Sequence, residues 1–101
     1  MVDDITRNIF LAFVRVHVLH HAGEEEIYGV EMIEELARHG YSIGPGTLYP
    51  LLHSMEKAGL LSCDSRNVGG KIRKYYRSTE SGEKTLAELR LKIRELVDEV
   101  L

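Results

Sequence analysis

Two amphipathic helical segments separated by a short turn constrain the fold of this chain most. In the first, residues 28–39, the apolar stripe consists of Met32, Ile33, Leu36 and Ala37. Gly40 predicts the end of this helix, and Pro45 suits the first position of the next. The next helix places on one face Leu48, Leu51, Leu52 and Met55, and Ala58-Gly59 closes it. Two helices joined so closely are typical of a helix-turn-helix.

The second of these helices has a polar face opposite its apolar one. At 100° per residue, Pro50, His53 and Lys57 point away from the leucines, with Tyr49 and Ser54 on the flanks. An interior proline removes one hydrogen bond, so we expect a bent but continuous helix.

A short basic β-hairpin is predicted to follow. Residues 60–64 form one strand and residues 72–78 the other, joined through residues 67–70. Period-two alternation divides the second strand into two faces: Arg73, Tyr75 and Arg77 on one, Ile72, Lys74 and Tyr76 on the other.

Helices are predicted at both ends of the chain. The first begins at Asp3 or Asp4, ends at Gly23 and is apolar nearly all round; a strand competes over residues 14–18, but length and caps favour helix. The last begins after Thr79 or Ser81, and its coiled-coil spacing connects Leu86, Leu89, Ile93, Leu96 and Val100. The fold class is therefore mainly α with a small β-hairpin. A chain of 101 residues forms one domain with a modest core, so this apolar seam predicts a partner subunit.

The distribution of charge matters more than the net charge of −3. Residues 1–37 carry eight acids and two bases, residues 38–77 carry seven bases and two acids, and residues 78–101 carry six acids and four bases. A basic middle between acidic flanks is what a DNA-binding face would give, but a mosaic of solvated surface charges explains this distribution equally well.

The polar face and the hairpin supply groups suited to DNA. A helix can enter the major groove, about 12 Å wide, while a basic hairpin can reach the flanking backbone or the minor groove. The candidate hydrogen-bond donors are Thr47, Tyr49, His53 and Ser54, and the candidate cations are Lys57, Lys71, Arg73 and Lys74. Alternatively, Tyr49, Tyr75 and Tyr76 pack the hairpin against the helices; we favour packing for Tyr76 and DNA for Tyr49.

Several runs resemble the PadR family of transcription regulators. They are Tyr28-Gly29, Gly46-Thr47-Leu48-Tyr49-Pro50-Leu51-Leu52, Gly59-Leu60-Leu61, Arg73-Lys74-Tyr75-Tyr76-Arg77, and Thr79 with Gly82. The resemblance covers residues 9–101. It implies a winged helix-turn-helix homodimer that binds an inverted-repeat operator, usually as a repressor, with Tyr49 and its neighbours Gly46 and Pro50 in the recognition helix and Lys74 and Tyr75 on the wing.

The chain departs from the family at three positions. Gly44 stands where a capping Ser is common, Ser54 where a basic residue is common, and Ser78 where a Leu is frequent. The single last helix resembles the short subfamily. We therefore expect a winged helix-turn-helix over residues 1–80 and a dimerisation helix over residues 81–101, with an interface made by Phe10, Phe13, Leu86, Leu89, Ile93, Leu96, Val97 and Val100. Phe10, Phe13 and Val14 also suit an apolar pocket for a planar aromatic effector between subunits, although ordinary dimer core is the preferred interpretation.

Other features argue against further functions. His17 and His21 share a helical face beside His20, but no Cys or carboxylate in the same turn completes a metal site, so no metal or other cofactor is expected. The chain has one cysteine, Cys63, which is consistent with a reducing compartment. We expect Cys63 to act as a small core residue. The acidic start and interrupted apolar stretch fit neither signal peptide nor membrane span, so we expect a cytoplasmic protein.

The alternatives to DNA binding are an enzyme and a protein-interaction module. No nucleophile with a base, carboxylate pair or phosphate-binding loop is recognisable, which argues against an enzyme. A winged-helix module that binds proteins instead of DNA remains the second hypothesis, and the acidic net charge favours it.

Overall fold

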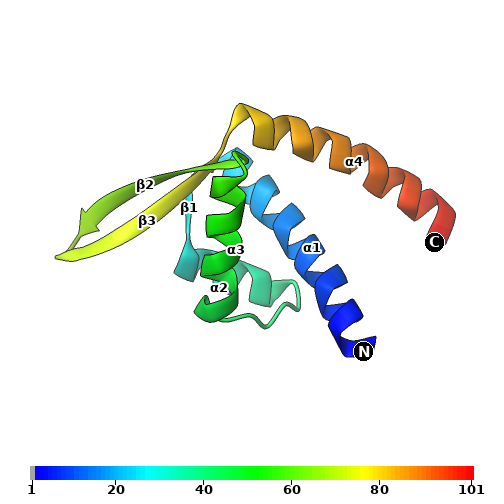
Figure 1. Ribbon diagram of the computed structural model, residues 1–101, viewed down its shortest axis with the longest axis horizontal. Coiled ribbons are helices and arrows are strands. Elements are labelled where there is room, and N and C mark those ends of the chain that lie inside the picture. Colours follow the sequence, from blue (N-terminus) through cyan, green and yellow to red (C-terminus); the bar gives the residue numbers. More distant parts are fainter. Residues whose placement is uncertain (1) are drawn as a thin grey trace.

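The computed structural model describes residues 2–101 as four helices and a small antiparallel sheet (Figure 1). The elements are α1 (Val2–Glu24), β1 (Ile27–Tyr28), α2 (Gly29–Arg38), α3 (Pro45–Lys57), β2 (Leu61–Val68), β3 (Lys71–Ser78) and α4 (Glu80–Val100). The predicted fold class is confirmed: a winged helix-turn-helix followed by a C-terminal helix.

The core gathers one face of each helix around the base of the sheet. Its fully buried members from the helices include Val14, Val18, Met32, Leu36, Leu48 and Leu52. The stretch 14–18 lies inside α1, so the helical interpretation of this segment is confirmed. The helix α3 starts at Pro45 and continues through Pro50 to Lys57, as expected.

The sheet differs from the predicted hairpin in two ways. A two-residue strand, β1, precedes α2 and pairs with β3, which gives the strand order β1-β3-β2. The strand β2 starts one residue later than predicted and extends to Val68, not Asp64. Gly69 and Gly70 both have positive φ, the backbone of a two-residue turn whose twist matches paired strands, so pairing continues to Val68 and Lys71.

The start of α4 is fixed by contacts with the loop before β2. Thr79 caps α4 by accepting a hydrogen bond from Gly82 N at 3.0 Å, and its hydroxyl donates to Gly59 O at 2.6 Å. Thr79 N also donates to Leu60 O. Beyond this anchored end, α4 and α1 run side by side with their far ends apart (Figure 1). Among residues 2–101, no helix is both long and apolar enough to cross a membrane.

Candidate nucleic-acid interface

The polar face of α3 is exposed along most of its length. Gly46, Pro50, His53 and Lys57 all lie on the surface, as the helical periodicity predicts. At its start, Thr47 Oγ1 accepts a hydrogen bond from Arg7 at 3.3 Å. Arg7 thus lies beside the start of α3, a placement that sequence reasoning missed because the two residues are 40 positions apart.

Ser54 fits its expected role poorly. Its hydroxyl donates to the backbone oxygen of Leu51 at 2.7 Å, within α3. A phosphate oxygen needs a hydrogen-bond donor, and in this rotamer the Ser54 hydroxyl already donates its hydrogen bond to the Leu51 carbonyl.

Tyr49 packs against α2 while remaining 40% exposed. Its ring lies over Gly29, where a Cβ atom would stand 2.4 Å from the Tyr49 ring carbon Cε1. Only a glycine leaves room for the ring at this point, which explains why α2 starts with Gly29. One part of the ring therefore packs on α2, as in the packing interpretation, while the exposed remainder stays a predicted DNA contact. The Tyr28-Gly29 pair is the sequence signal of the packing.

On one face of the sheet, aromatic rings and guanidinium groups of the hairpin and β1 stack on one another. The Arg73 guanidinium lies 4.3 Å from the centre of the Tyr28 ring, and the Arg66 guanidinium lies 4.4 Å from that of Tyr75. Tyr28 and Tyr75 meet edge to face. Arg73 and Tyr75, both predicted DNA contacts, thus belong to a packed face whose members Tyr28 and Arg66 the sequence analysis did not select.

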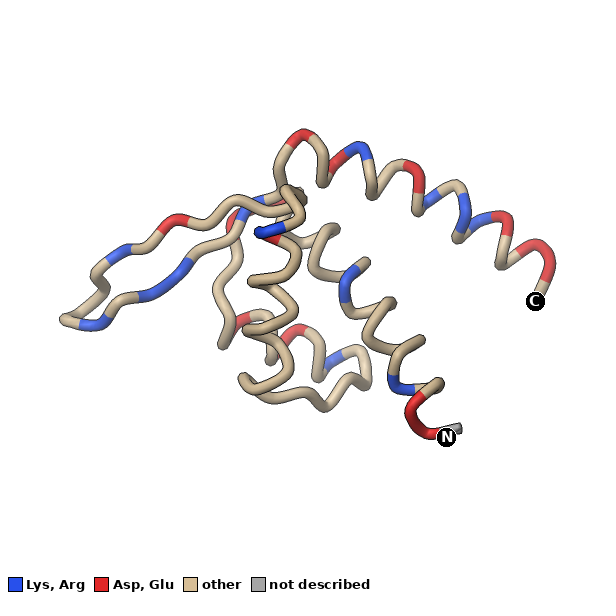
Figure 2. Tube along the Cα trace, viewed as in Figure 1, with Lys and Arg blue, Asp and Glu red and all other residues tan. Residues whose placement is uncertain are grey.

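Two of the hairpin's arginines are locally neutralised. Arg66 donates to both carboxylate oxygens of Glu26, at 2.5 and 2.6 Å, and to Asp64 at 2.9 Å, while Arg77 lies 3.7 Å from Glu26. The hydrogen bonds from Arg66 hold the pKa of Glu26 below its ordinary value. Within residues 2–101, no carboxylate pairs with the three remaining cations, Lys71, Arg73 and Lys74. Figure 2 shows in blue where Lys and Arg residues lie along the hairpin. The uncompensated positive charge therefore lies toward the hairpin tip.

Lys74 projects on the other face of the sheet. It pairs in register with Ser65 and shares its face with Tyr76, which is 3% exposed and packs in the core as predicted. Burial raises the pKa of Tyr76 to about 12, and Glu56 and Tyr49 of α3 contribute to this shift. Lys74 is thus the cation on the sheet face that packs toward α3.

The proposed dimer residues divide into buried and exposed groups. Leu86, 5% exposed, belongs to the core of the subunit and has little surface left for a partner. Leu89 is half-buried. The exposed members are Phe10, Phe13, Ile93, Leu96, Val97 and Val100. An open, mostly apolar cleft of about 840 Å³ lies between α1 and α4, and Phe13, Ile93, Leu96 and Val97 line it.

Comparison with known proteins agrees with this architecture. Residues 18–88 match the Transcriptional regulator PadR-like family. Transcriptional regulator Rv3488 of Mycobacterium tuberculosis is 49% identical over 90 residues, which cover 89% of this chain and 84% of that protein.

Solved structures of similar size share the fold. A PadR family transcriptional regulator from Eggerthella lenta is 37% identical, with a TM-score of 0.79 over 98% of this chain and 91% of that one. A PadR-like transcription factor from Bacteroides fragilis is 28% identical, with a TM-score of 0.84 over 96% and 95% of the two chains. The family match together with the 49% identity shows that this chain belongs to the PadR-like family of transcriptional regulators.

Proposed function

We propose that this regulator is a homodimeric repressor that binds an inverted-repeat operator through α3 and the β2–β3 hairpin. The observation that carries the proposal is the combination of an exposed polar face on α3 with a hairpin whose outer cations have no carboxylate partner within residues 2–101. Phosphate neutralisation by such cations supplies much of the affinity for DNA.

The two elements fit different parts of a DNA duplex. The face of α3 carries a tyrosine, a histidine and one lysine, groups that hydrogen-bond to base edges but add little charge. Arg7 of α1, which lies beside the start of α3, and Lys71 and Lys74 of the hairpin would supply charge on either side of α3, where the DNA backbone would pass. In this arrangement α3 reads bases and the flanking cations position it.

Dimerisation follows from the exposed apolar residues of α4. Ile93, Leu96, Val97 and Val100 face solvent in the single subunit, and such a seam is normally covered by another helix. A second copy of the chain presents the same seam, and two-fold symmetry then matches an inverted repeat.

Release by an effector is the remaining part of the proposal. The cleft between α1 and α4 is apolar and large enough for a planar aromatic ligand, and Ile93, Leu96 and Val97 belong both to its lining and to the proposed dimer seam. A ligand held there would change how the two subunits lie and hence the spacing of their two α3 helices. We infer a cytoplasmic location, because a regulator must reach the DNA that carries its operator, and in bacteria this DNA lies in the cytoplasm.

Selection of bound sequences from random duplex DNA, followed by fluorescence anisotropy at several salt concentrations, tests this function. We expect an inverted repeat with half-site centres about 34 Å apart and binding that weakens steeply with salt. A protein with no salt-sensitive binding to any selected sequence would instead act as a protein-interaction module, the second hypothesis raised by the net charge.

A further inference from the structure

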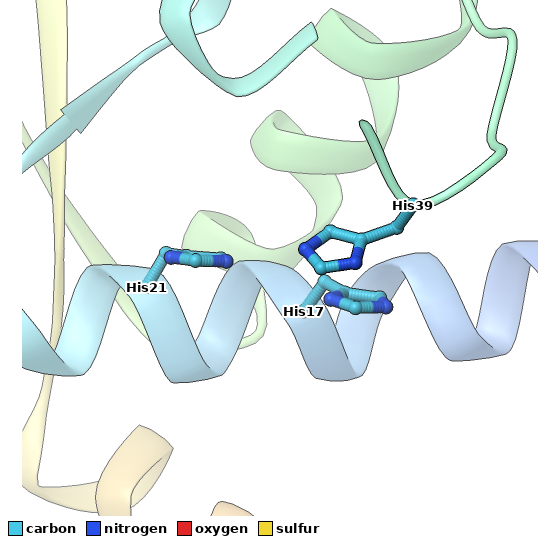
Figure 3. Close-up of side chains that lie close together, drawn as sticks. All are labelled: His17, His21 and His39. Carbon is cyan, nitrogen blue, oxygen red and sulfur yellow. The ribbon is translucent and has the colours of Figure 1, made fainter. Parts of the chain in front are cut away.

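Three histidines from two different elements converge on one side of α1. His17 and His21 lie one turn apart on α1, and His39 follows the last residue of α2. One ring nitrogen from each lies within 4.8 Å of the others. Figure 3 shows His39 reaching from the end of α2 over the ring of His17, with His21 farther along the same side of α1.

Neighbouring side chains hold these rings in place. The rings of His17 and His39 stack with their centres 4.7 Å apart, and Tyr41 meets the His17 ring edge to face at 5.5 Å. Glu35 Oε1 lies 3.5 Å from Nε2 of both His21 and His39. The second carboxylate oxygen of Glu35 pairs with Arg38, which leaves Oε1 directed at the two histidines.

We propose that His17, His21 and His39 bind a divalent transition-metal ion of the zinc type, with Glu35 as the fourth ligand. Imidazole nitrogens suit Zn²⁺, and three nitrogens with one carboxylate oxygen make a four-coordinate set. Nitrogen ligands about 2.0–2.1 Å from a tetrahedral zinc ion lie about 3.4 Å apart. The three histidine nitrogens lie within 4.8 Å of one another, so side-chain rotations would have to shorten these distances when the ion binds.

The surroundings of His17 favour its neutral ring. Burial, followed by the neighbouring rings of His39 and His21, lowers the pKa of His17. The neutral ring is the form in which imidazole binds metal.

A second cluster, His20, His21 and Glu24, is less suited to the ion. Its three residues all lie on α1, and His20 and Glu24 already pair with each other at 3.3 Å while 44% and 66% of their side chains are exposed. His21, which both clusters share, is 24% exposed, Glu35 is 25% exposed and His39 is 45% exposed. The first cluster is preferred because it joins α1 to the end of α2 and has a carboxylate oxygen of Glu35 beside it.

Isothermal titration calorimetry of the untagged full chain with ZnCl₂ tests the site, with DNA absent throughout. We expect one ion per chain and a rise in Tm with zinc, because the ion binds the folded form. His39→Ala and His17→Ala should each weaken zinc binding by more than about tenfold. Loss of a residue that only orients a metal ligand already costs about that much affinity, and loss of a ligand itself should cost at least as much. His20→Ala, the matched control on the same helix, should leave the affinity unchanged.

Three results would overturn the proposal. They are no zinc binding by the wild-type chain, equal affinity in the wild type and His39→Ala, or loss of binding in His20→Ala with retention in His39→Ala, which would assign the ion to the second cluster. His39 lies on the surface after α2, so His39→Ala decides the question even where His17→Ala fails to fold; circular dichroism without zinc checks the fold of each variant. Because the readout involves no DNA, a failure here leaves the proposed operator binding untouched.

Discussion

At the scale of single residues, the contact between Tyr49 and Gly29 connects packing with recognition. The ring of Tyr49 covers the backbone at the start of α2, so the orientation in which Tyr49 leaves α3 depends on a residue of another helix. What projects outward is the remaining exposed part of the ring. A change at Gly29 should therefore reach the proposed DNA surface without touching it directly.

Gly29→Ala should destabilise the chain by about 1–3 kcal/mol, because the new Cβ overlaps the Tyr49 ring and forces it to move. Chemical denaturation measures the free energy of unfolding. In a Tyr49→Ala background the same substitution should cost much less, since the ring is gone, and the double-mutant cycle isolates this coupling.

Gly23→Ala is the matched control for that substitution. No heavy atom lies within 4 Å of a Cβ at Gly23, and alanine is the better helix residue, so stability should stay the same or rise by about 0.5–1 kcal/mol. An equal cost for Gly29→Ala with and without Tyr49 would contradict the packing described for this ring.

Cys63 should react slowly with alkylating reagents in the folded protein. Burial is the main cause that raises the pKa of its thiol, so less of the reactive thiolate forms at pH 8 than in the unfolded chain. Rates of iodoacetamide labelling, followed by mass spectrometry with and without denaturant, check this. A native rate equal to the denatured rate would show a thiol that is neither buried nor shifted.

At the scale of elements, hydrophobic periodicity and capping residues predicted the helices, because both signals lie in residues that are close together in the sequence. The helices α3 and α4 begin at the expected residues because Pro45 and Thr79 act locally. The helix α1 begins at Val2, so Asp3 and Asp4 lie in its first turn and not at the expected cap. The strand β1 could not be predicted, since two residues show no period and their pairing partners lie in β3.

The faces of the hairpin show the same limit. Alternation correctly separated Lys74 from Arg73 and Tyr75, but which face packs toward α3 depends on the burial of Tyr76 and on β1. His39 likewise joins His17 only through the packing of α2 on α1, so no local spacing reveals the cluster. Contacts between distant segments are therefore the part of the site that the sequence left open.

The attachment of α4 gives an element-scale prediction. Thr79→Ala removes both the cap on Gly82 N and the hydrogen bond to Gly59 O, and should lower the free energy of unfolding by about 1 kcal/mol. Thermal unfolding measures the change. Thr79→Ser keeps the hydroxyl and should stay close to wild type; an equal loss in both variants would mean that the methyl group, not the cap, matters here.

At the scale of the whole molecule, the unpaired cations and most of the exposed apolar surface lie on different elements. The cations without carboxylate partners lie toward the hairpin tip (Figure 2), where Val68 and Ile72 are also exposed, whereas most of the exposed large apolar residues lie on α1 and α4. One end of the molecule is thus suited to a polyanion and another to a second subunit. The acidic net charge does not oppose DNA binding, because Glu26 and Asp64 pair with Arg66 and Arg77, while Lys71, Arg73 and Lys74 keep no carboxylate partner within residues 2–101.

Lys74→Ala should weaken operator binding and reduce the slope of log K against log salt concentration by about one, because one phosphate contact is lost. Fluorescence anisotropy over a salt series gives this slope. Lys92→Ala removes the same charge from the exposed surface of α4 and should leave affinity and slope unchanged. Identical slopes for wild type and Lys74→Ala would exclude a phosphate contact at this residue.

The dimer seam is tested by charges placed where the subunit does not need apolar side chains. Ile93 and Leu96 are 41% and 51% exposed, so Ile93→Glu with Leu96→Glu should leave the folded subunit intact while burying charge in any interface formed there. We expect a monomer by light scattering, with the helix content of the wild type by circular dichroism. Leu91→Glu adds a charge on the opposite side of α4, at a residue 68% exposed, and should keep the dimer. If the double variant retained the dimeric mass, the contact between subunits would have to lie elsewhere, and Phe10 and Phe13 on α1 would be the next residues to change.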